Sequence, residues 1–132
     1  MSFKNITGAP VIRASKSDFN DLKKFVTSEL GEDDPDIENA RIADIALAVG
    51  IAENETAKVP SDGQTQFNLD SLDKQGVMKV IIEERHPEAE PQELRSLLQD
   101  YLEGGIQEIS SQINDGGVFD YHRYLDMSEN QV

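Results

Sequence analysis

The sequence of 132 residues has no cysteine, no tryptophan and only two histidines, His86 and His122. Without cysteine there are no disulfides, thiolate zinc sites, iron–sulfur clusters or cysteine nucleophiles. Two histidines leave little material for histidine-based catalysis, and 26 scattered acidic residues single out no catalytic pair. No apolar run approaches the roughly 20 residues that span a bilayer. We therefore expect a protein that is not an enzyme, with no cofactor, no metal site and no membrane segment.

The chain also lacks the apolar core of a signal peptide, because it turns polar directly after Met1-Ser-Phe3. This pattern predicts a cytoplasmic protein. Leu, Ile, Val and Phe together supply 34 of the 132 residues. That share exceeds the roughly 20% below which a highly charged chain stays disordered. The length suits one domain of ordinary size.

Basic residues are scarce outside the N-terminal quarter of the chain. Residues 1–24 contain five Lys or Arg and two Asp, a net charge of +3, whereas residues 25–132 contain 7 basic and 24 acidic groups, a net charge of −17. An acidic body repels phosphate backbones over about a Debye length, roughly 8–10 Å. Any contact with nucleic acid should therefore use the N-terminal quarter. The plain alternative is an acidic surface that only keeps the protein in solution.

The N-terminal half predicts a short strand followed by two helices. Residues 10–14 contain Pro and β-branched residues and favour an extended segment. Ser15 is a good N-cap for a helix that ends at Gly31. A second helix is expected from Ile37 to Ile51, with Arg41 and Asp44 on or beside its polar flank.

The C-terminal half predicts a second extended piece at residues 65–69 and two further helices. The third helix is expected to begin at an Asp70 or Ser71 cap and to end at Pro87. The fourth opens at Pro91 and closes at Gly116-Gly117. Gly104-Gly105 lies in its middle, where close approach of another backbone explains the two glycines.

The expected fold is therefore a mainly α domain with one or two short strands. We divide the chain into a flexible arm (residues 1–9), a single helical domain (10–117) and a tail (118–132). The tail carries three aromatic residues that we expect to bind a partner or to dock on the domain itself. These are Phe119, Tyr121 and Tyr124.

A basic strand followed by a basic helix has the order of a ribbon–helix–helix module. In such modules the strand pairs with its copy in a second subunit, and the paired ribbon meets DNA. Basic side chains at the helix start then contact phosphates. The candidate DNA-binding residues are Arg13, Lys16, Lys23 and Lys24. An ordinary helical hairpin with solvated lysines is the alternative.

Several short motifs, in order, resemble the DndE family, the small helical subunit of the DNA phosphorothioation (DNA sulfur modification) system. They cover roughly residues 10–113. They begin with Ile12-Arg-Ala-Ser-Lys16 and Leu22-Lys23, continue with Arg41-Ile-Ala43 and Phe67-Asn68, and end with Tyr101-Leu-Glu-Gly-Gly-Ile106.

The resemblance implies a self-associating helical subunit that acts beside a cysteine desulfurase, a sulfur-transfer enzyme and an ATPase. It also implies binding of DNA, including nicked duplex, through surface lysines. The matching positions here are Lys16, Lys23 and Lys24, with Arg13 beside them. Two departures weaken the DNA inference: the loop at residues 31–36 is acidic, and Glu103 replaces an arginine of the family.

The sequence therefore predicts a non-catalytic accessory subunit of DNA phosphorothioate modification that binds DNA, scaffolds the modifying enzymes, or both. A ribbon–helix–helix regulator is one alternative. An acidic adaptor or DNA mimic is another, which the acidic body favours and the N-terminal lysines do not explain.

Overall fold

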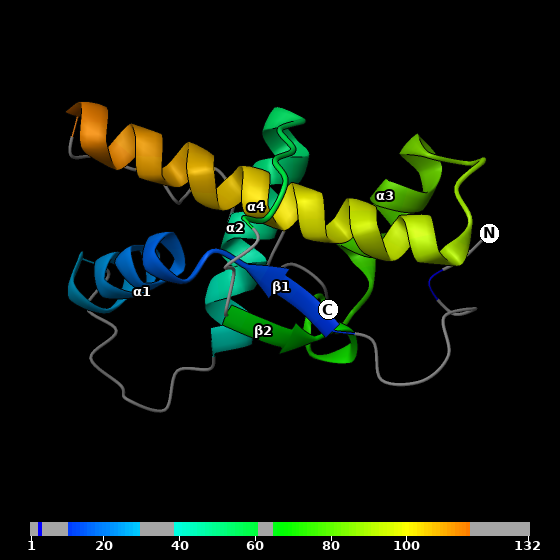
Figure 1. The fold of residues 1–132 in the computed structure, drawn as a ribbon, viewed down its shortest axis with the longest axis horizontal. Coiled ribbons are helices and arrows are strands. Elements are labelled where there is room, and N and C mark those ends of the chain that lie inside the picture. Colours follow the sequence, from blue (N-terminus) through cyan, green and yellow to red (C-terminus); the bar gives the residue numbers. More distant parts are fainter. Residues whose placement is uncertain (1–2, 4–10, 30–38, 61–64, 117–132) are drawn as a thin grey trace.

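The computed structural model describes residue 3 and residues 11–29, 39–60 and 65–116. Figure 1 shows a mainly helical molecule in which the long helix α4 crosses α2 and lies beside β1 of the two-stranded sheet. This arrangement confirms the predicted fold class. In chain order the elements are β1 (Val11–Ala14), α1 (Lys16–Glu29), α2 (Asn39–Glu53), β2 (Thr65–Asn68), the 3-10 turn η2 (Leu69–Ser71), α3 (Val77–Arg85) and α4 (Pro91–Gly116).

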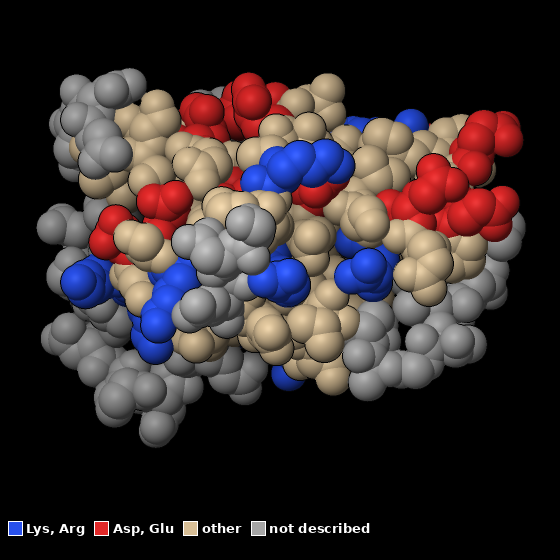
Figure 2. Space-filling view, viewed as in Figure 1, with Lys and Arg blue, Asp and Glu red and all other residues tan. Residues whose placement is uncertain are grey.

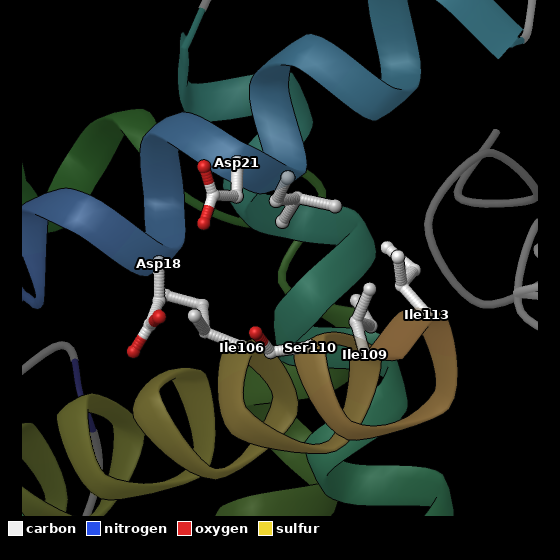
Figure 3. A pocket seen from close by; sticks show the side chains of 7 residues that line it. Asp18, Asp21, Ile106, Ile109, Ser110 and Ile113 are labelled. Atoms are coloured by element: carbon white, nitrogen blue, oxygen red, sulfur yellow. The ribbon is translucent and has the colours of Figure 1, made fainter. Parts of the chain in front are cut away.

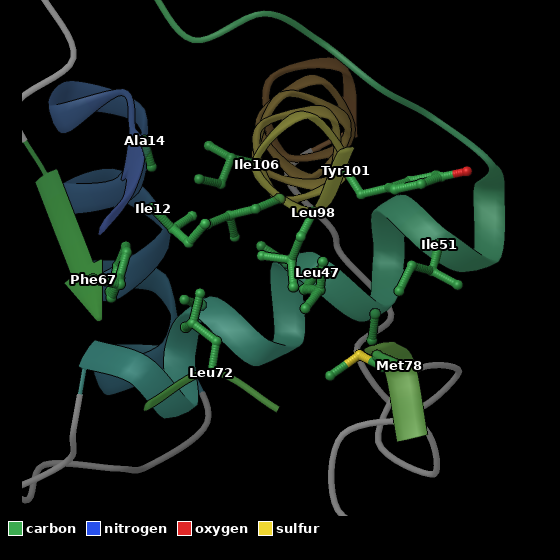
Figure 4. Packing of buried hydrophobic residues seen from close by; sticks show 14 of the residues in the cluster. Ile12, Ala14, Leu47, Ile51, Phe67, Leu72, Met78, Leu98, Tyr101 and Ile106 are labelled. Atoms are coloured by element: carbon green, nitrogen blue, oxygen red, sulfur yellow. The ribbon is translucent and has the colours of Figure 1, made fainter. Parts of the chain in front are cut away.

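Helix α2 lies at the centre of the core and packs most extensively against α4. It is apolar on nearly all sides, as expected of a helix surrounded by other elements. Figure 4 shows Leu98 and Tyr101 of α4 lying against Leu47 and Ile51 of α2.

The predicted close approach at the paired glycines of α4 is confirmed. A Cβ atom built at Gly105 would overlap the carbonyl oxygen of Ala46 in α2, and one at Gly50 would overlap the carbonyl oxygen of Tyr101 in α4. The two helices therefore meet backbone to backbone. Gly104 faces another segment, since its Cβ would overlap the carbonyl oxygen of Glu55.

Both predicted extended segments form strands, and they pair with each other in antiparallel register. Ile12 lies opposite Phe67, and both side chains are buried in the core (Figure 4). The Phe67 ring meets the Phe19 ring of α1 edge-to-face, with centroids 5.2 Å apart. Because side chains alternate along a strand, Arg13 and its partner Gln66 are exposed on the outer face of the sheet.

The predicted start of the third helix is wrong. Residues 69–71 form a separate 3-10 turn. The Asn68 side chain caps this turn by accepting the N–H of Asp70. Helix α3 begins only at Val77, after Gly76, which has a left-handed φ of 82°. Gly76, which lies inside the helix expected from Asp70 or Ser71 to Pro87, is instead the residue that allows the chain to turn into α3.

Several sequence predictions lie outside the described residues. These are the arm except Phe3, the acidic turn at 32–36, and the tail with Phe119, Tyr121 and Tyr124. Phe3 itself is buried with the core residues.

Candidate nucleic-acid interface

Helix α1 divides its polar side chains between two flanks. Lys16 and Lys23 lie seven residues apart, which is two helical turns, so they share one flank about 10 Å apart along the axis. Asp18 and Asp21 lie on the other flank. They line a groove of about 130 Å³ that α1 forms with α4, and Figure 3 shows them above Ile106 and Ser110. The two acidic groups therefore face away from Lys16 and Lys23, whereas Lys24, three residues after Asp21, lies on the same side of the helix as Asp21.

The predicted residue Arg13 joins this basic flank from the sheet. It is exposed on the outer face of β1, and only two residues separate it from Lys16. Lys16 and Lys24 are exposed, and Lys23 is half-buried. Figure 2 shows basic side chains over β1 and α1, with acidic side chains beside them over α1 and a larger acidic cluster over the start of α4. We call Arg13, Lys16, Lys23 and Lys24 the basic face.

Side chains of α4 bind the second edge of β1. The Arg95 Nη1 donates to the Val11 carbonyl oxygen at 3.0 Å, and the Arg13 N–H donates to Gln99 Oε1 at 2.9 Å. The N–H of Ser15, the next residue after the strand, donates to Glu103 Oε1 at 2.9 Å.

The spacing of these side chains explains how one helix can bind successive backbone groups along one strand edge. Arg95, Gln99 and Glu103 are four residues apart, about 6 Å along a helix, and the strand groups that they bind recur every two residues, about 6.6 Å. We call these three residues the edge clamp.

The edge clamp changes the interpretation of β1 as a strand that pairs with its copy in a ribbon–helix–helix dimer. The strand–helix–helix order is present, but β1 pairs with β2 of its own chain on one edge and with the edge clamp on the other. The edge that a second copy would use in a ribbon–helix–helix dimer is occupied. A homo-oligomer, which stays a prediction, would use another surface.

Glu103, the third member of the edge clamp, has a structural role. Its side chain is fully buried, and it also accepts a 2.6 Å hydrogen bond from the Ser15 hydroxyl. The Gln107 side chain donates to both Glu103, at 2.7 Å, and Asp18, at 2.9 Å. The Glu103 charge is thus directed at the start of α1, where the helix dipole favours an anion, and not at the surface.

Sequence reasoning missed the edge clamp. Its signal is a polar residue at every fourth position of a long amphipathic helix, which is also the spacing of an ordinary solvated stripe. The clamp orients Arg13 and brings a further guanidinium, that of Arg95, to the margin of the basic face.

Arg41 and Asp44 were expected on or beside the polar flank of the second helix. In the structure they belong to a largely buried polar network. Asp44 is almost fully buried, pairs with Arg41 at 2.9 Å and accepts the Asp73 N–H at 2.9 Å. Burial raises the pKa of Asp44 to about 6, against the opposing effects of the Asp73 N–H and Arg41. Arg41 also donates to the Ser71 carbonyl oxygen, and Asp73 accepts the Lys79 N–H. The network anchors the segment between β2 and α3 to α2.

No family model, curated protein or solved structure matches this chain. The resemblance to the DndE family therefore stays a prediction that rests on the motifs themselves.

The described residues contain neither a cluster that could hold a metal ion nor a helix that could span a membrane. Within residues 11–29, 39–60 and 65–116, no group of three His, Asp or Glu side chains is placed to hold a metal ion. Over the same part of the chain, no helix is both long and apolar enough to cross a membrane.

Proposed function

We propose that this protein binds duplex DNA through the basic face, as a non-catalytic accessory subunit of DNA phosphorothioate modification. The observation that carries the DNA part is the sorting of charge at the β1–α1 junction. Arg13 and Lys16 lie at this junction and Lys23 follows two helical turns later on the flank of Lys16, while Asp18 and Asp21 of the same helix line the groove with α4. Such an array suits phosphate contacts, which position a protein on the duplex without reading its sequence.

The acidic remainder of the chain limits how DNA can approach. With a net charge of −14, the protein is repelled from DNA in most orientations, so the contact is confined to the basic face. This predicts a short footprint with few phosphates and an affinity that falls steeply with salt.

The modification part of the proposal rests on the ordered DndE-like motifs. It predicts a preference for nicked over intact duplex and association with the cysteine desulfurase, sulfur-transfer enzyme or ATPase of that pathway. Phe119, Tyr121 and Tyr124 are the proposed residues for the protein contact.

The experiment is fluorescence anisotropy with intact and nicked duplex across a salt series. The double variant Lys16→Ala/Lys24→Ala removes two exposed charges from the basic face. The matched control, Lys58→Ala/Lys74→Ala, removes two exposed charges elsewhere. We expect the first variant to lose about 1–2 from the salt slope and about tenfold or more in affinity, and the control to lose neither.

Equal slopes for the two variants would overturn the role of the basic face. No binding by the wild type at low salt would reject DNA binding altogether and favour the acidic adaptor. Binding without preference for a nick would leave DNA binding in place and remove this support for the modification pathway.

A further inference from the structure

A second polar site lies where α2 and α3 end beside α4. Asn54, Arg85, His86 and Tyr101 line a shallow hollow of about 420 Å³ there. None of these residues belongs to the basic face. The hollow is therefore independent of the proposed DNA contact.

The end of α2 places Asn54 at this hollow. Its φ of 52° is left-handed, and the Asn54 and Glu55 N–H groups bind the carbonyl oxygens of Ile51 and Gly50. This is the Schellman arrangement, in which asparagine tolerates the left-handed residue that follows a helix. The backbone conformation is thus explained by capping, and the side chain is the part available for another role.

The hydroxyl of Tyr101 organises the polar groups of the hollow. The ring is buried, and Figure 4 shows the hydroxyl pointing out of the core. The hydroxyl donates to Asn54 Oδ1 at 3.3 Å and lies 3.1 Å from His86 Nε2. A phenol has one proton, so when it is given to Asn54, His86 Nε2 must carry the hydrogen of the second bond. In that arrangement the Nε2 hydrogen of His86 is donated to the Tyr101 hydroxyl oxygen.

Arg85 completes a set of hydrogen-bond donors. Its guanidinium lies 5.9 Å from the centroid of the Tyr101 ring and makes one long bond, Nη1 to Asn54 Oδ1 at 3.4 Å. Within the described part of the chain, Arg85 forms no ion pair, in a protein with 26 acidic residues. Most of its donors, like the Asn54 amide nitrogen, have no acceptor in this network.

We propose that this hollow binds a phosphate group. Its lining offers a guanidinium and an amide nitrogen, and the one strong acceptor, Asn54 Oδ1, already receives two hydrogen bonds. His86 lies beside them and reports on the site. Guanidinium groups bind phosphate oxygens through charge-assisted, paired hydrogen bonds. The volume exceeds that of one phosphate group, so the hollow also admits part of the molecule that carries the phosphate.

The test is a proton NMR titration of the histidine ring signals. The chain has two histidines, so His86 reports on the hollow and His122 serves as an internal reference. The probes are inorganic phosphate, AMP and a short DNA duplex, each compared with sodium chloride at equal ionic strength. We expect at least one phosphate probe to shift the His86 signal saturably, and chloride to leave it unchanged.

Two variants that each remove one positive charge decide whether the shift reflects the hollow. Arg85→Gln should weaken binding about tenfold or more, which is the loss of one charge-assisted hydrogen bond. Lys74→Gln is the control, because Lys74 is an exposed cation that belongs neither to the hollow nor to the basic face, and it should not change the titration.

The responding probe identifies the source of the phosphate: a free anion, a nucleotide or the DNA backbone. The proposal is overturned if no phosphate probe gives a saturable shift, if chloride gives the same shift, or if Arg85→Gln binds as well as the wild type. Failure here leaves the basic face untouched, since that face is tested with lysine variants.

Discussion

Helix α4 contacts α2 and β1 by opposite means. Toward α2 it presents glycine, and the two backbones touch without side chains between them. Toward β1 it presents the edge clamp of long polar side chains, which bind one strand edge group by group. The two contacts meet in three consecutive residues: Glu103 binds Ser15, Gly104 faces Glu55, and Gly105 faces Ala46.

The difference shows how one helix sets two kinds of geometry. The glycine contact is steric and sets how closely α2 and α4 approach, so it tolerates no added atom. The edge clamp is directional and sets the register of β1, and with it the position of Arg13 and of the start of α1. If Arg95 or Gln99 is lost, the backbone group that it binds can form a hydrogen bond with water instead. The groups bound by the buried Glu103 cannot.

The largest effect is expected from adding one methyl group to the steric contact. Gly105→Ala should destabilise the protein by more than about 3 kcal/mol, because α2 and α4 must separate to admit the Cβ. The control is Gly76→Ala, where no atom lies within 4 Å of the new Cβ and only the left-handed φ resists, at about 1 kcal/mol. Urea unfolding measures both, and similar losses would contradict a backbone-to-backbone contact.

The buried end of the edge clamp should give the next largest effect. Glu103→Ala leaves the Ser15 N–H and hydroxyl buried without their acceptor, so we expect a loss of about 2–3 kcal/mol. Glu103→Gln keeps one acceptor oxygen and should lose about half as much. Thermal unfolding of the two variants checks this order. Almost no loss in Glu103→Gln beside a large loss in Glu103→Ala would mean that filling space, not hydrogen bonding, is what Glu103 contributes.

A buried polar contact should also make stability depend on pH. The folded-state pKa of Asp44 is raised from 3.8 to about 6, so the folded protein holds a proton that the unfolded chain releases. The resulting stabilisation is present below pH 4 and is lost as the pH rises through 6, on the order of 2–3 kcal/mol.

The matched variant Asp44→Asn should lack this pH dependence. Asparagine keeps an oxygen that can accept the Asp73 N–H but does not titrate. Urea unfolding of both proteins between pH 4 and pH 6 measures the difference. Parallel pH profiles would show that Asp44 titrates equally in the folded and unfolded states.

The smallest effect is expected at the exposed part of the edge clamp. Gln99→Ala frees the Arg13 N–H, which water can reach, so the loss should be about 0.5–1 kcal/mol. Hydrogen exchange at the Arg13 amide is the more sensitive measurement and should become faster in this variant. Unchanged exchange would show that Gln99 does not protect the strand edge.

Much of the local structure could be predicted from the sequence. Ser15 before α1, Pro91 at the start of α4 and the alternating pattern at residues 65–69 each report a local backbone preference, and each prediction is confirmed. Gly104-Gly105 is the one pattern that predicted a tertiary contact, because two glycines inside a helix have no local benefit. The start of the third helix was predicted wrongly because a glycine such as Gly76 is compatible with two positions. It can lie inside a helix, which it destabilises, or just before one, where a left-handed φ turns the chain into the helix.

What the sequence determined alone is the content of helix and strand, the charge asymmetry and the close approach at α4, because these depend on residue type and spacing along the chain. Only the tertiary structure decided that β1 pairs within its own chain, that Glu103 is buried beneath α1, and that Arg85, His86 and Tyr101 share a hollow with Asn54. Each of these joins residues from separate elements, and a polar side chain looks the same in sequence whether its partner is water or a distant backbone group.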